Sequence, residues 1–392
     1  MKKFNVKMLY AYKFISQCLP IYAFYAILFI ERGQSVTGVA VLIALWSVFS
    51  ILFEMPAGIL ADKWNRRNML AISAVLQGLC FVVWLFSHTF FMFAIGFVIW
   101  ALSGAFASGT EEGLIYDNLK SDGREKDFTK VYARAELFAT IGVLAGIVSA
   151  GVKVSFVSLE TIVLISAAVS FLSAIFALHI REKNYYSEQG KDKSSGFFAT
   201  FKEASSFVKG SNVALVSILF LVLFVLGDYL DEFDALIIND FGLPHVWVSV
   251  ILSVRFIFIA IGDVLAPVVQ KKITSIKQIF LLNCSACVFL LIFAAMWSQY
   301  ALLIFGLACM VMAISRILLV NALQNEIKEE GRATVMSFVS IGQNIAMICL
   351  SLVYAWLAGL LPLQQVYITL SIYGLIGGLA FFLLLAVIKT RT

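Results

Sequence analysis

Long apolar runs, separated by short polar stretches, alternate along the whole chain. An α-helix rises 1.5 Å per residue, so about 20 apolar residues cross the roughly 30 Å hydrocarbon core of a bilayer. The pattern therefore predicts twelve membrane-spanning helices and an all-α membrane protein. The expected spans are residues 8–30, 37–60, 69–87, 90–110, 133–152, 158–179, 212–231, 246–268, 277–297, 300–321, 334–357 and 364–388.

The longest polar stretch, residues 181–211, divides the expected spans into two sets of six. We expect an N-terminal six-helix bundle over 1–180, a cytoplasmic linker over 181–211 and a C-terminal six-helix bundle over 212–392. Within the linker, residues 197–210 form either an amphipathic helix on the membrane surface or a partly ordered connection.

The composition indicates that lipid is the solvent of these spans, since 61% of the residues are hydrophobic and 14% are charged. A soluble domain of this length cannot bury so much apolar surface. Lys2, Lys3 and Lys7 precede the first apolar run as in a signal peptide. No small-x-small cleavage site follows that run, so we expect a retained first span. The absence of a P-loop argues against direct use of ATP by this chain.

The distribution of Lys and Arg predicts the orientation, because cytoplasmic loops carry an excess of both. With both termini in the cytoplasm, Arg32 and Lys153 are the basic residues left on the outer side, and Arg255 and Arg316 remain inside spans. Lys13 is assigned to the inner side as a residue whose side chain reaches out of the first span to the membrane surface.

The stretch Glu54–Arg67, EMPAGILADKWNRR, joins the second span to the third, and its residues Asp62–Arg67 form the polar turn between them. It resembles the signature G-x-L-a-D-r-x-G-r-k of the major facilitator superfamily. The eighth span is followed by a weaker echo, GDVLAPVVQKK, and NEIKEEGRATVMS resembles a later inner loop of bacterial members. SGTEEGLIYDNL resembles the end of the fourth span in a bacterial subgroup of drug or metabolite exporters. The signature matches at Gly58, Leu60, Ala61, Asp62, Arg66 and Arg67, with Lys63 a conservative change and Asn65 in place of a glycine.

This resemblance implies two pseudo-symmetric six-helix bundles that carry a small molecule across the membrane by alternating access. It also implies a latch that ties the halves together at the inner face. The alternative is that the charges of this turn only set its orientation. The latch residues are Gly58, Asp62, Arg66 and Arg67, with Glu111, Glu112 and Asp117 as the acids available to them.

Charges inside the spans are further candidates, because one charge at mid-bilayer costs about 2.5–3.5 kcal/mol. Asp228, Asp231 and Glu232 share one helical face of the seventh span, and Arg255 lies nine residues into the eighth. In one interpretation they line a central cavity and bind substrate or a proton. In the other, the acids from Asp231 to Asp234 are the wet outer end of the span and Arg255 pairs structurally with Asp228. Either way, Asp228 is the expected partner of Arg255.

The roles of three further charged residues stay open. Asp263 and Arg316 lie at equal depth in the inner third of the eighth and tenth spans, which predicts an inner ion pair or a substrate contact. Glu54 is either a proton site or a partner for Arg134.

Two departures argue against proton antiport. Trp100 stands near the place where proton-coupled exporters usually carry an arginine, and the fifth span lacks their Gly-Pro pair. Gly142, Gly146 and Gly151 still allow close helix packing there. Other polar or amphipathic residues either line a cavity or pack between helices; they are Gln17, Tyr22, Tyr25, Gln343 and Asn344.

These observations predict a secondary transporter in a bacterial plasma membrane, with proton-coupled export of a small amphipathic molecule as the first hypothesis. Uptake of a metabolite by symport or uniport is the alternative, and a polytopic enzyme or sensor is the alternative from another class. We expect a monomer in the lipid bilayer, with a small-molecule substrate and protons as partners, no nucleic acid, no metal and no cofactor. His88, His179 and His245 are far apart, and Cys284 and Cys287 lie inside a span, where packing is their expected role.

Overall fold

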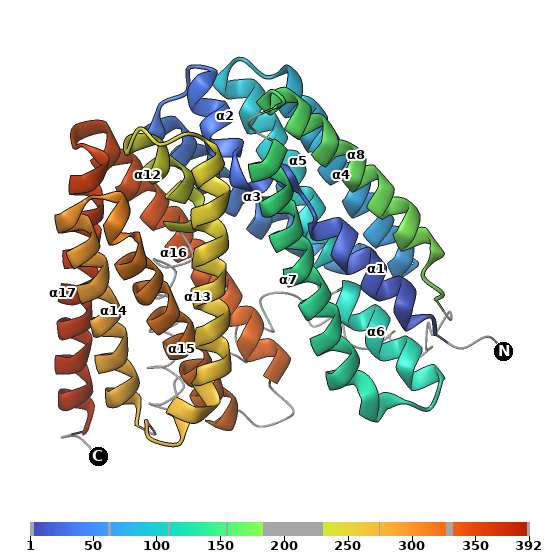
Figure 1. Cartoon of the computed structure of the whole chain (residues 1–392). Coiled ribbons are helices and arrows are strands. Elements are labelled where there is room, and N and C mark those ends of the chain that lie inside the picture. Colours follow the sequence, from blue (N-terminus) through green and yellow to red (C-terminus); the bar gives the residue numbers. More distant parts are fainter. Residues whose placement is uncertain are drawn as a thin grey trace. The chain divides into compact units, whose positions relative to one another are not determined.

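The computed structural model describes residues 4–61, 64–108, 110–153, 156–182, 230–273, 275–326 and 332–389. Its regular structure in these ranges is helical (Figure 1). Ten segments are long and apolar enough to cross a membrane, and they coincide with the first six expected spans and the eighth to eleventh. Helix α17 (Leu363–Lys389) occupies the place of the twelfth span, whereas the seventh lies almost entirely outside the described residues. The helices are therefore consistent with the expected twelve spans.

Two compact units make up the chain. The first comprises Met1–Ser194 and Pro244–Val250, and the second comprises Ser195–Leu243 and Ile251–Thr392. The elements of the first unit are α1 (Val6–Gln17), η1 (Pro20–Ala23), α2 (Tyr25–Glu31), α3 (Val36–Ala61), α4 (Arg66–Phe86), α5 (Phe90–Ala107), α6 (Thr110–Ser121), η2 (Glu125–Asp127), α7 (Phe128–Lys153) and α8 (Leu159–His179). The elements assigned mainly to the second are η4 (Asp231–Phe233), α12 (Asp234–Asp240), α13 (Val246–Gln270), α14 (Ile276–Met296), η5 (Gln299–Ala301), α15 (Leu302–Glu326), α16 (Arg332–Leu360) and α17.

The first span is broken, although the sequence predicted one continuous helix over 8–30. It consists of α1, the short η1 and α2. Pro20 has no N–H to continue the helix and forces an extended conformation on Leu19, whose φ and ψ are −111° and 99°. The N–H of Ile21 donates instead to the Ser166 hydroxyl of α8, at 3.0 Å. A neighbouring helix thus satisfies a backbone group freed by the break.

The fourth span is also longer than the predicted 90–110. Helix α5 ends at Ala107, and α6 continues from Thr110 to Ser121. The acids Glu111, Glu112 and Asp117 therefore lie on a helix rather than in a loop.

Glycines let α1 and α7 run close together in the first unit (Figure 1). A methyl group at Gly142 would collide with the backbone carbonyl of Phe14, and one at Gly146 would lie 2.8 Å from the backbone nitrogen of Leu19. The glycines of the fifth span thus support close helix contact, as small residues do at membrane helix interfaces.

An arginine holds the C-terminal end of α4 in place. Arg32 Nη1 donates to the backbone carbonyls of Trp84, Leu85 and Ser87 at 2.7–3.0 Å. These carbonyls lie at the C-terminal end of the helix, where four acceptors have no partner within the helix. The second guanidinium nitrogen lies 3.2 Å from Glu160 of α8, so Arg32 has a structural role.

Candidate functional site

A buried charged cluster lies inside the second unit, and we call Arg255, Asp234 and Cys309 the Arg255 cluster. Arg255 of α13 places Nη1 2.7 Å from Asp234 Oδ2 at the start of α12, and the two side chains are 7% and 2% exposed. Its Nε donates to Cys309 Sγ of α15 at 3.3 Å. The guanidinium also lies 5.9 Å from the centre of the Phe305 ring, within cation–π range. The cation that the sequence singled out is thus compensated by a buried carboxylate.

Two tyrosines and an unused carboxylate oxygen extend this cluster. Asp234 Oδ1 and the hydroxyl of Tyr367 are buried without a hydrogen-bond partner among the described residues. Tyr367 of α17 lies close enough to Asp234 and Arg255 for both charges to act on its hydroxyl, so α17 packs beside the pair. Tyr354 of α16 stacks on Phe233, with ring centres 4.0 Å apart. The cluster therefore combines a fixed cation, a carboxylate and a hydroxyl group in an aromatic environment.

The acids expected near the seventh span differ in whether the structure describes them and in how deeply they are buried. Asp228 lies outside the described residues, and so does the side chain of Asp231. Glu232 is half-buried and close enough to Asp234 for the two charges to interact. The interpretation of these acids as a wet outer end is wrong for Asp234, which is almost fully buried. At about 100° per residue, Asp234 lies about 240° around an α-helix from Asp228, so the face drawn through Asp228, Asp231 and Glu232 does not include it.

A second charged cluster, in which Lys13 is buried and Glu136 is exposed, joins three helices of the first unit; we call Lys13, Glu111 and Glu136 the Lys13 cluster. Lys13 of α1 is 7% exposed. Its Nζ lies 2.8 Å from Glu111 Oε1 of α6 and 3.0 Å from Glu136 Oε1 of α7. The predicted extension of Lys13 to the membrane surface is therefore wrong, because two acids compensate its charge inside the unit. The sequence feature that could have predicted this cluster is the presence of one cation and two acids at the expected inner ends of three spans.

The acids proposed for the latch have separate partners. Asp117 accepts from Arg66 Nη1 at 2.6 Å, so the structure brings these two residues together within the first unit. Glu111 instead contacts Lys13, and Glu112 accepts from the Tyr132 hydroxyl at 3.0 Å. A methyl group at Gly113 would collide with the Arg66 guanidinium, so this glycine makes room for the Arg66–Asp117 pair.

Sequence reasoning missed Glu182 as a partner of the motif. Its two carboxylate oxygens accept from the backbone N–H groups of Arg66 and Arg67, at 2.8 and 3.2 Å. These groups begin α4, where unpaired donors and the helix dipole favour an anion. Asp62 lies outside the described residues. Of Gly58, the structure describes only the helical backbone.

The remaining charged candidates are more exposed than Arg255 and Asp234. Asp263 and Arg316 are both exposed and lie within electrostatic reach of each other. Gly262 lets α13 approach α15 there, since a methyl group at this position would lie 2.7 Å from the Met310 carbonyl. Glu54 is half-buried and has no hydrogen bond or ion pair with another described residue, Arg134 included.

Aromatic side chains surround Trp100, where an arginine would be usual. Trp100 stacks on Tyr22 with ring centres 5.7 Å apart and contacts Tyr25 and Trp84 at 6.1 and 5.5 Å. Gln77 donates to the Tyr22 hydroxyl at 2.6 Å. Tyr22 and Trp100 are only half-buried, so their rings present an aromatic surface with one polar group. Across the described chain, no three His, Cys, Asp or Glu side chains are placed to hold a metal ion.

Comparison with known proteins identifies the family. The Major Facilitator Superfamily profile matches residues 14–327. The chain is 35% identical over 78 residues to the MFS-type transporter YfkF of Bacillus subtilis, covering 19% of this chain and 18% of YfkF. It is 26% identical over 175 residues to a Na⁺, Li⁺, K⁺/H⁺ antiporter of Planococcus maritimus, covering 43% of this chain and 38% of the antiporter. The alignments thus span well under half of either relative.

Solved structures share the fold across nearly the full length. The nucleoside transporter NupG superposes with a TM-score of 0.80 at 15% identity, covering 96% of this chain and 98% of NupG. A bacterial homologue of the lysosomal transporter Spinster gives a TM-score of 0.69 at 15% identity, covering 97% of this chain and 95% of the homologue. At such low identity the likeness establishes the fold.

Proposed function

Because the chain belongs to the Major Facilitator Superfamily, a family of secondary transporters, we propose that it exports a small amphipathic molecule across a bacterial plasma membrane in exchange for protons. The proposal is carried by the Arg255–Asp234 pair, a titratable carboxylate that contacts a permanent cation in the interior of one unit. Similarity to a cation/proton antiporter over 175 residues also supports exchange against protons.

The pair offers a physical means of coupling. The proton affinity of a carboxylate depends on its hydration and on its distance from a cation. A guanidinium stays charged at all physiological pH values, so protonation of Asp234 would release Arg255 rather than neutralise it. The deprotonated carboxylate would bind a cationic or hydrogen-bond-donating group of the substrate from the cytoplasm, through Oδ1. Protonation of Asp234 from the outside would expel the substrate, and loss of that proton to the cytoplasm would restore the pair. The proton and the substrate would thus cross in opposite directions.

The aromatic surface around Trp100 favours an amphipathic cargo. Stacked rings attract apolar groups and organic cations, and the Tyr22 hydroxyl and Gln77 amide add polar partners. Sodium or potassium ions need oxygen ligands rather than ring faces, so a metal cation is the less favoured cargo at this surface.

Everted membrane vesicles that acidify their interior by respiration provide the test, with acridine orange as the pH indicator. Ethidium is the amphipathic probe, and NaCl, KCl and uridine are compared with it. We expect ethidium to release protons from wild-type vesicles, and Asp234→Asn to abolish this release. Asp240→Asn is the matched control, because Asp240 is an exposed acid on the same helix.

Other outcomes would redirect the proposal. A response to NaCl or KCl but not to ethidium would identify a metal cation as the cargo. Uridine counterflow that is independent of the pH gradient, with no response to ethidium, would favour metabolite uptake. A full ethidium response from Asp234→Asn vesicles would remove Asp234 from the coupling mechanism.

A further inference from the structure

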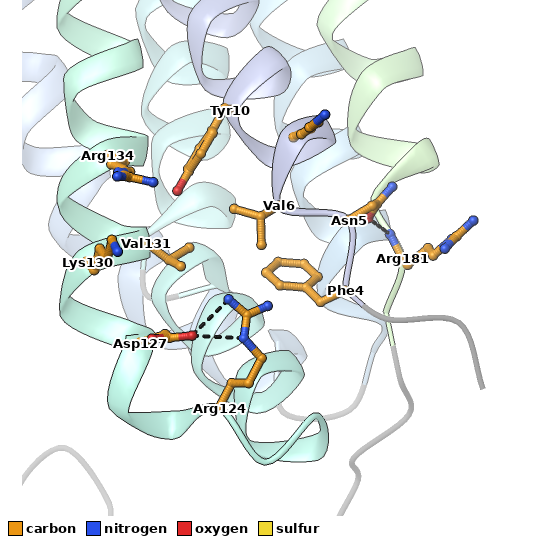
Figure 2. Close-up of a pocket in the computed structure, with 11 residues that line it drawn as sticks. Phe4, Asn5, Val6, Tyr10, Arg124, Asp127, Lys130, Val131, Arg134 and Arg181 are labelled. Atoms are coloured by element: carbon orange, nitrogen blue, oxygen red, sulfur yellow. Dashed lines mark hydrogen bonds and ion pairs between the residues drawn. The ribbon is translucent and has the colours of Figure 1, made fainter.

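A basic cavity of about 620 Å³ lies within the first unit, at the N-terminal ends of α1 and α7 (Figure 2). It is separate from both charged clusters. Figure 2 shows Lys130 and Arg134 of α7 on one side of the cavity and Phe4 and Val6 on the other. Five of the eleven lining residues are cations, namely Lys7, Arg124, Lys130, Arg134 and Arg181, and one is an acid, Asp127.

Most of this positive charge is not compensated by the lining residues. The acid, Asp127, accepts a hydrogen bond from Arg124 at 2.8 Å and so compensates one of the five cations. Lys7, Lys130 and Arg134 make no hydrogen bond or ion pair with any other residue that the structure describes, and all three are exposed. Like charges repel, so three such cations gathered at one cavity favour an anionic ligand.

The other part of the cavity wall is apolar and continues along an exposed side of α7. Phe4, Val6, Tyr10 and Val131 line the cavity. Tyr10 stacks on Phe138, with ring centres 5.1 Å apart and ring planes 12° apart.

Helical spacing joins the charged and apolar parts into one stripe. Lys130, Arg134, Phe138 and Ile141 follow one another at intervals of four, four and three residues on α7. The stripe is therefore cationic at its start and apolar further into the span. Phe138 and Ile141 are 37% and 43% exposed, as expected of side chains that contact lipid.

We propose that this cavity binds the phosphate headgroup of an anionic phospholipid, with an acyl chain lying along Tyr10 and Phe138. The cations would contact the phosphate, and the apolar stripe would contact the chain. Basic pockets between membrane helices on the cytoplasmic side suit such headgroups. The expected orientation places the cavity at that side, because it lies at the N-terminal end of α1. A free phosphate ion would use the cations but not the stripe.

Native mass spectrometry of the full-length protein, purified in a neutral detergent, can count the bound lipid. The probes are dioleoyl phosphatidylglycerol, dioleoyl phosphatidylcholine and inorganic phosphate. We expect one tightly retained phosphatidylglycerol and a rise in unfolding temperature that neither other probe reproduces. Equal retention of phosphatidylcholine, or equal stabilisation by inorganic phosphate, would overturn the proposal.

Variants separate this cavity from general attraction to a basic surface. The triple variant Lys7→Gln/Lys130→Gln/Arg134→Gln should weaken phosphatidylglycerol binding by about fivefold for each cation removed. The control Lys126→Gln/Lys271→Gln/Lys272→Gln removes the same charge from exposed residues that do not line the cavity and should bind like the wild type. Equal losses in the two triple variants, or no loss in the first, would contradict a specific site.

Two single variants keep the test decisive if the triple variant does not fold. Arg134→Gln alone should weaken phosphatidylglycerol binding about fivefold. Phe138→Ser should weaken binding of the dioleoyl lipid while leaving any weak stabilisation by soluble glycerol phosphate unchanged. Unaltered lipid binding in both variants would overturn the proposal.

Discussion

The ammonium group of Lys13 lies 2.8 Å from a carboxylate oxygen of Glu111, which joins α1 to α6 inside the first unit. The residues are 98 positions apart in the sequence. The Lys13 and Glu111 side chains are 9% and 16% exposed, and Lys13 also lies 3.0 Å from Glu136. Removing Lys13 would therefore leave Glu111 as an uncompensated charge away from water, whereas Lys13 without Glu111 would keep one acid.

A double-mutant cycle tests this dependence. Lys13→Met should destabilise the protein by about 3 kcal/mol, and Lys13→Met/Glu111→Gln should be less destabilised than the sum of the two single changes. Unfolding in detergent, followed by tryptophan fluorescence, gives the free energies. The control is Arg124→Gln, whose pair with Asp127 is 41% and 42% exposed and should contribute under about 1 kcal/mol. Additive losses in the cycle would show that Lys13 and Glu111 are not coupled.

The pair of Arg66 with Asp117 leads to a prediction for the signature loop. Arg66→Ala and Asp62→Asn should slow transport while costing about 1 kcal/mol of stability or less, since both residues belong to the polar turn and the Arg66–Asp117 pair is partly open to solvent. The measurements are ethidium-driven proton release from vesicles and the unfolding temperature of the same proteins. If both variants turn over at the wild-type rate, these charges serve only to orient the loop.

The coupling carboxylate can be identified by comparing Asp228→Asn with Asp234→Asn. We expect the variant at the coupling position to lose transport driven by a pH gradient but to keep substrate exchange without a gradient, because its carboxylate can no longer titrate. Arg255→Ala should impair both activities, since it leaves Asp234 buried without its cation. If both Asn variants transport normally against a gradient, coupling lies elsewhere, with Glu54 as the next candidate.

The proposed orientation can be tested with single cysteines in a variant whose six native cysteines are replaced. Lys126→Cys should resist a membrane-impermeant maleimide in intact cells, because its loop is expected in the cytoplasm. Tyr300→Cys should react, since Tyr300 is 80% exposed and its loop is expected outside. Both sites should react in permeabilised cells. Labelling of Lys126→Cys in intact cells would reverse the orientation.

The number and positions of the helices could be predicted because apolar length is a local property of the sequence. Twenty apolar residues need an internally bonded helix in lipid wherever they occur. The signature loop was found in the same way, since its residues are contiguous. Local signals also allowed Arg255 to be singled out, because a charge in an apolar run needs compensation in any fold.

The sequence by itself therefore determined the spans, the family resemblance and the residues that need partners. The tertiary structure decided which residues serve as those partners. Asp234 meets Arg255 because the start of α12 packs beside α13, and Lys13 meets Glu111 and Glu136 because α1, α6 and α7 converge. Periodicity within one helix carries no information about which residue of another helix lies opposite. That choice depends on helix crossing and on breaks such as the one at Pro20, which only the packed chain fixes.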